Sequence, residues 1–191
     1  MTVIPCEQEP IYVGQTNERL RTRIRRHLTN QRTDAVAMSV LDPFEVFEIE
    51  VWPLPHLQLA NRADIDARQH LDALERGITA QAVENSQFKA ILNEKDPPPG
   101  TLMVEAPPSA RGRIVSERVF ELRSHPDFRL ARRALILSRL AQVISERKVQ
   151  GGLRRVLLTQ AKRLQWLAAR RYDALAGAAS VANEGEAEDD A

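Results

Sequence analysis

A block of prolines and glycines near the middle of the chain most constrains how this sequence can fold. Residues 96–112 read DPPPGTLMVEAPPSARG and contain six prolines or glycines before Ser109. Proline lacks the backbone N–H that regular elements need, so this block cannot lie inside a helix or a central strand. The sequence therefore predicts two units, residues 1–95 and 113–176, joined by a semi-extended linker over 96–112.

The first unit alternates between strand-like and helix-like patterns. Short apolar or alternating stretches indicate strands, and apolar residues spaced three and four apart indicate helices. This order is typical of an α+β fold with a small antiparallel sheet flanked by helices. In chain order, we expect strands over 3–4, 11–13 and 44–52, and helices over 18–30, 63–82 and 86–92.

The second unit is predicted to be helical. A short helix is expected over 113–122, and a longer one begins near Ser124 and Pro126. The Gly151-Gly152 pair separates this helix from another that runs to about residue 175, so the two form an α-helical hairpin. The end of the chain, residues 177–191, is acidic and is predicted to be disordered.

Charge is distributed unevenly, although the formal net charge is only +1. Residues 1–110 carry 11 basic and 16 acidic side chains, and residues 111–175 carry 16 basic and 5 acidic ones. A strongly basic block favours a polyanionic partner such as DNA, the alternative being a merely solvated face. The expected outward basic face of the hairpin includes Arg132, Arg133, Arg154, Arg155, Lys162 and Arg163.

Other features of the composition limit the class of protein. The single cysteine, Cys6, excludes an internal disulfide and favours a reducing, cytoplasmic location. No apolar run has the length of a membrane span. Four scattered histidines and one cysteine give no zinc-binding spacing.

Residues 12–27, YVGQTNERLRTRIRRH, carry most of the functional information. Gly14 allows a sharp turn or a close approach, and Thr16 or Asn17 suits a helix cap. Arg19, Arg23 and His27 then recur every four residues as a polar stripe beside an apolar one. Arginine holds phosphate with paired hydrogen bonds, and histidine exchanges protons near neutral pH. The alternative is a solvated or nonspecific basic face that also includes Arg26.

The order and spacing of these residues resemble the GIY-YIG nuclease superfamily. Tyr12-Val13-Gly14 matches its second half-motif, and Arg23 and His27 stand where the family has an arginine and often a histidine. By the same resemblance, Glu75 is the metal-binding glutamate and Asn93 the closing asparagine. Asp72 and Glu84 compete with Glu75 for its role. The likeness covers roughly residues 3–98.

The resemblance implies hydrolysis of DNA phosphodiester bonds with Mg²⁺, or another divalent cation, held by Glu75. Arg23 would stabilise charge on the phosphoryl oxygens, and Tyr12, helped by His27, would orient or deprotonate the attacking water. Arg19 and Arg26 would contact the nucleic acid.

One part of the family pattern is missing from this sequence. The first half-motif, Gly-Ile-Tyr, should precede Tyr12 by about ten residues, and the segment MTVIPCEQEP holds no tyrosine. Either the true first strand is encoded upstream, or the chain is a divergent member without one catalytic tyrosine. Two other functions therefore stay open: an inactive nucleic-acid-binding module, and a structural or regulatory protein whose hairpin docks a partner. The oligomeric state is also left open.

Overall fold

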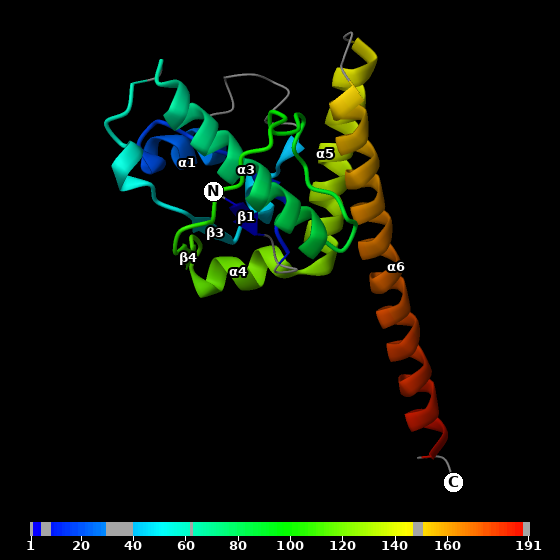
Figure 1. Ribbon diagram of the computed structural model, residues 1–191. Helices are drawn as coiled ribbons and strands as arrows, with labels where there is room; N and C mark the ends of the chain where they lie inside the picture. Colours follow the sequence, from blue (N-terminus) through cyan, green and yellow to red (C-terminus); the bar gives the residue numbers. More distant parts are fainter. Residues whose placement is uncertain (1, 5–8, 30–39, 62, 147–150, 189–191) are drawn as a thin grey trace.

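The chain folds as α+β, with a small antiparallel sheet and mostly helices around it, as the sequence predicts (Figure 1). The computed structural model describes the backbone of residues 2–4, 9–29, 40–61, 63–146 and 151–188. Side chains are described for residues 9–25, 40–61, 63–146 and 151–177.

Four strands form the sheet in the order β2-β1-β3-β4, and every neighbouring pair is antiparallel. The strands are β1 (Thr2–Ile4), β2 (Tyr12–Val13), β3 (Glu48–Val51) and β4 (Ala110–Arg113). The predicted pairing of residues 3–4 with 11–13 is confirmed, because Val3 lies opposite Tyr12 in the register.

Strand β3 is shorter than the predicted 44–52 because a turn replaces its beginning. Pro43–Glu45 form the 3-10 helix η1, which Asp42 caps by accepting a hydrogen bond from the Phe44 N–H. Proline at the first position favours this turn.

The fourth strand begins inside the expected linker and ends one residue beyond it. Residues of β4 are all exposed, and Arg111 forms an ion pair with Glu48 on the neighbouring strand. Ser109 also donates a hydrogen bond to Glu50 across this edge. Such a polar edge strand carries no alternating apolar pattern, so the sequence gives no sign of it.

Among the described residues, the first unit contains the helices α1 (Leu20–Thr29) and α3 (Ile65–Asn85). Asp64 caps α3 by accepting from the Ala67 N–H. The helix predicted over 86–92 is wrong. There the Ser86 hydroxyl donates to the Ala90 carbonyl, and Lys89 has a φ of 50°, so the chain closes a turn instead. A second 3-10 helix, η2, covers Pro55–Leu57.

After β4, the described part of the chain continues with the helices α4 (Glu117–Ser124), α5 (Pro126–Glu146) and α6 (Gly151–Glu188). The short helix begins later than predicted because 110–113 form a strand and Ser116 supplies the cap. Helix α6 packs on α5 and then projects beyond the rest of the molecule (Figure 1). It continues to Glu188, so most of the stretch 177–191, for which the composition predicts disorder, is helical.

The principal core joins both halves of the sequence. Ile11, Val46 and Ile49 pack in one buried cluster with Leu140 and Val156 of the helical hairpin. A second cluster lies between β2 and α3 and contains Val13, Leu74 and Ile78. The hairpin therefore completes the core of the sheet instead of forming a separate one. Within the described part of the chain, no helix is both long and apolar enough to cross a lipid bilayer.

Candidate active site

The ring of Tyr12 lies directly over Gly14. A Cβ atom on residue 14 would stand 3.0 Å from the Tyr12 hydroxyl and 3.1 Å from its Cε1 atom, which is closer than ordinary packing allows. No glycine among the described residues has a positive φ. Gly14 thus permits the close approach that the sequence suggests without a shift of the ring, and the approaching group is the tyrosine two residues earlier.

Arg23 of helix α1 reaches the Tyr12 hydroxyl. Its guanidinium interacts with that hydroxyl through a hydrogen bond and through charge. Burial nevertheless raises the pKa of Tyr12 above its ordinary value of 10, because desolvation outweighs the opposing effect of Arg23. At neutral pH the side chain is therefore an un-ionised phenol, which can orient a water or a phosphate oxygen but is a poor base.

Two carboxylates of α3 meet the residue that follows the glycine. Gln15 donates its backbone N–H to Glu75 Oε1 at 3.2 Å, and its side-chain amide to Asp72 Oδ1 at 2.7 Å and Glu75 Oε2 at 3.2 Å. Asp72 and Glu75 are three residues apart on a helix and so share a face. Gln15 was not predicted from the sequence, although it follows the Tyr-Val-Gly motif directly.

Glu75 lies within electrostatic reach of Tyr12. Burial raises the pKa of the Glu75 carboxyl above its ordinary 4.5, the hydrogen bonds from Gln15 oppose this, and the charge of Asp72 adds to it. A carboxylate in this state is stabilised by a nearby cation.

Asn93 holds the edge of β2 in place. Its side-chain oxygen accepts from the Val13 N–H at 3.1 Å, and its amide donates to the Val13 carbonyl at 2.7 Å. One residue earlier, the Leu92 N–H donates to the Ile11 carbonyl at 2.7 Å. The Asn93 side chain therefore makes the two backbone hydrogen bonds that a neighbouring strand would make with Val13. In this way it fixes the backbone beside Tyr12.

Two cavities adjoin these residues. The first has a volume of about 510 Å³ and is lined by Gly14, Gln15 and Glu75 together with apolar side chains. The second has a volume of about 480 Å³, and Arg23 and Asp72 line it. Both share the segment Gln15–Glu18, so they meet along the chain that links β2 to α1.

The structure places the remaining residues that the sequence predicts near Tyr12 in different ways. Arg19 is exposed and lines the first cavity, and its carbonyl accepts the first backbone hydrogen bonds of α1. Thr16 does not cap that helix, because its hydroxyl accepts from the Glu18 N–H in a preceding turn. His27 and Arg26 belong to α1, but their side chains lie outside the described residues.

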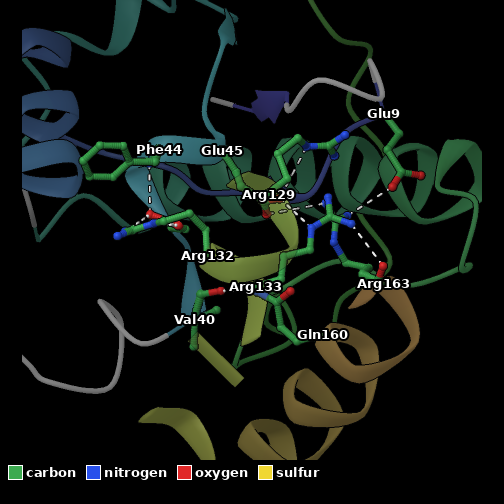
Figure 2. Close-up of polar contacts among 10 residues, drawn as sticks. Glu9, Val40, Phe44, Glu45, Arg129, Arg132, Arg133, Gln160 and Arg163 are labelled. Carbon is green, nitrogen blue, oxygen red and sulfur yellow. Dashed lines mark hydrogen bonds and ion pairs between the residues drawn. The ribbon is translucent and has the colours of Figure 1, made fainter. Parts of the chain in front are cut away.

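The predicted basic face of the hairpin is partly wrong. Arg133 and Arg163 are each only 2% exposed. Figure 2 shows them converging with Arg129 on Glu45 and Glu9. Arg133 donates to Glu45 and to the Arg163 carbonyl at 3.1 Å, and Arg163 donates to Glu9 at 3.1 Å. These arginines hold the hairpin to the first unit and cannot present a DNA-binding surface.

Arg132 pairs with an acidic residue of the first unit, and Arg155 with the first residue of the linker. Arg132 donates twice to Asp42, at 2.7 Å each, and stacks on Phe44 (Figure 2). Arg155 forms a two-pronged pair with Asp96, and both side chains stay substantially exposed. Of the predicted set, Arg154 and Lys162 are exposed on α6. Nucleic-acid contact through these two residues stays a prediction.

A divalent cation fits the donor set in chemical terms. Over the described residues, no group of three or more His, Cys, Asp or Glu side chains is placed to hold a metal. Magnesium, however, is commonly held by one or two carboxylates and completes its shell with water and substrate oxygens. The paired Asp72 and Glu75 meet that requirement, whereas Glu84 is exposed and lines neither cavity.

Comparisons with models of protein families, with curated proteins and with solved structures give no significant match for this chain. The interpretation of the site therefore depends on its own geometry and on the motif.

Proposed function

We propose that this protein is a metal-dependent endonuclease that hydrolyses DNA phosphodiester bonds, with a GIY-YIG-like arrangement of its first unit. The observation that carries the proposal is the meeting of three groups from separate elements at the end of β2. Tyr12 lies over Gly14, Arg23 reaches its hydroxyl, and Glu75 lies within electrostatic reach. A phenol, a guanidinium and a carboxylate together suit a phosphodiester and a cation.

Each side chain has a distinct part in the proposed reaction. Arg23 binds the phosphoryl oxygens and stabilises the charge that develops on them. Tyr12, as a neutral phenol, orients the attacking water, and the proton goes to another acceptor, for which His27 is the candidate from the sequence. Glu75, with Asp72, would hold the cation, which when bound supplies charge neutralisation and a more acidic water.

The test is magnesium-dependent nicking of plasmid and labelled oligonucleotide DNA. We expect Arg23→Ala and Glu75→Ala to lower the cleavage rate by at least about 100-fold, the cost of losing one charge-stabilising group. Arg21→Ala, on an exposed position of the same helix, and Glu84→Ala, on an exposed position of α3, are the matched controls. Equal rates for Arg23→Ala and Arg21→Ala would overturn the proposed role of Arg23.

A second candidate is a nucleic-acid-binding module without turnover. The residue opposite Tyr12 in the sheet register is Val3, so β1 places no second tyrosine beside the first. This candidate predicts salt-sensitive DNA binding without cleavage at any divalent cation concentration. Absence of both binding and cleavage would instead favour a structural or regulatory role.

A further inference from the structure

The first cavity has a mainly apolar lining, which phosphodiester hydrolysis alone does not require. Its wall is mainly apolar and is lined by Val13, Trp52, Leu54, Leu71, Leu74 and Ile78. The polar residues of the lining are Gln15–Arg19, Gln58 and Glu75. A volume of about 510 Å³ lies within the range of roughly 300–1,000 Å³ typical of small-ligand sites, which combine apolar walls with few polar groups.

The position of this cavity limits what can occupy it. It borders the Tyr12–Arg23–Glu75 group through Gly14 and Glu75, and Arg19 lies on its lining. The second cavity, with Arg23, shares the segment Gln15–Glu18. A ligand with an anionic group near these two arginines would therefore have its apolar part beside the first cavity. Nucleotides have this division between a charged phosphate and a flat base whose faces stack on apolar and aromatic surfaces.

Trp52 supplies the surface that a flat ring needs. It follows β3, is half-buried and packs against the cluster of Val13, Leu74 and Ile78. Stacking of a base on an aromatic side chain contributes about 1–3 kcal/mol and does not depend strongly on the base. Gln15 and Glu75, which are hydrogen-bonded to each other, also line this cavity.

We propose that this cavity seats one unpaired nucleobase of the DNA substrate, stacked on Trp52, next to the phosphate held by Arg23. The proposal rests on the proposed nuclease function and makes it more specific. Because a base inside a duplex is stacked on both faces, it would have to leave the helix to enter. The preferred substrate is thus DNA with an unpaired nucleotide and not a continuous duplex.

The experiment uses the full chain with Trp166→Phe, so that Trp52 is the only tryptophan. Trp166 packs against Phe88 and Arg170 and does not line the cavity. Trp52 emission is followed during titration with a single-stranded pentanucleotide and with a pentanucleotide of abasic sites. We expect a change in emission with the first, and at least about fivefold weaker binding of the second, the factor that corresponds to about 1 kcal/mol of stacking. Titration with a deoxynucleoside monophosphate shows whether a single nucleotide is enough to change the Trp52 emission.

Equal affinity for the intact and abasic strands, or binding of neither, would overturn the proposed seat. Trp52→Phe is expected to keep the base preference and Trp52→Ala to remove it, and the abasic comparison decides the matter even if Trp52→Ala fails to fold. Cleavage of the same strands is measured in parallel. Base-dependent binding without cleavage would support the base-binding cavity and overturn the nuclease function. Cleavage without a base preference would support the nuclease function and overturn the base-binding cavity.

Discussion

Residue 14 controls where the Tyr12 ring can lie. Atoms of the ring lie 3.0–3.3 Å from where a β-carbon would stand, and Arg23 meets the hydroxyl from the neighbouring helix. The same short stretch presents Gln15 to Asp72 and Glu75. At this scale, the candidate site places Tyr12 against Gly14, and Gln15 against two carboxylates of α3.

We expect Gly14→Ala to displace the Tyr12 ring and lower DNA cleavage. The added Cβ must push the ring by a few tenths of an ångström, at a cost in stability of about 1–3 kcal/mol typical of overpacking. Gly77→Ala is the control: it lies in helix α3 with open space around it and is expected to gain up to about 1 kcal/mol. Cleavage assays and urea unfolding measure both. Unchanged cleavage in Gly14→Ala would contradict the packing role of the glycine.

Glu75 should make the folded state more sensitive to pH. Its folded-state pKa is raised by burial, so its contribution to stability is complete below the unfolded-state value near 4.5 and is lost as pH rises through the folded value. In Glu75→Gln the side chain cannot ionise, so the stability that Glu75 loses as pH rises is not lost in the variant. We therefore expect the stability of the variant relative to the native protein to increase between pH 4 and pH 7.

Urea midpoints at the two pH values measure this difference, and Glu84→Gln controls for the loss of one carboxylate on the same helix. A constant difference between Glu75→Gln and the native protein would show that the Glu75 carboxyl is not destabilised by its surroundings. The hydrogen bonds from Gln15 favour the charged carboxylate, so they oppose this effect and limit the size of the expected difference.

The elements are held together by pairs that are distant in sequence. Asn93 completes the edge of β2 from 80 residues away, and β4 pairs with β3 across about 60 residues. Helices α1 and α3 follow from their own periodicity and, for α3, from the Asp64 cap. Strand β4 cannot be predicted in this way, because its sequence ARGR has no alternation of apolar residues and all its side chains are exposed. Its pairing partner alone makes it a strand.

Asn93→Ala should destabilise the protein by about 1–3 kcal/mol, because it leaves the Val13 N–H and carbonyl without their partners next to a buried side chain. Asn85→Ala, at an exposed position near the end of α3, is the matched control. Denaturant unfolding distinguishes them, and an equal loss in both variants would argue against the strand-substitute role of Asn93.

At the scale of the molecule, acidic residues of the first unit neutralise much of the basic block. Arg163 pairs with Glu9, Arg133 with Glu45 and Arg132 with Asp42, all at least partly buried. Burial, and then the charge of Arg133, lower the pKa of Arg163 to about 10, so it is charged at neutral pH. The helical hairpin and the sheet therefore depend on each other, although a proline-rich segment connects them.

Glu45→Ala should cost about 3–5 kcal/mol, because three arginines that surround it in the interior would lose a carboxylate. Glu48→Ala removes a glutamate from the exposed edge pair with Arg111 and should cost no more than about 1 kcal/mol. Thermal and urea unfolding compare the two. Similar losses would mean that the buried cluster does not hold the two halves together.

The sequence by itself determined what depends on near neighbours. Turn chemistry and helix periodicity act within a few residues. They give the Tyr-Val-Gly strand end, the Arg23 helix and the shared helical face of Asp72 and Glu75. Only the tertiary structure decided which arginines lie inside. Arg163 and Lys162 are adjacent, yet one is buried against Glu9, 154 residues away, and the other is exposed. A charge is buried only where a distant partner meets it, and spacing along the chain does not reveal that partner.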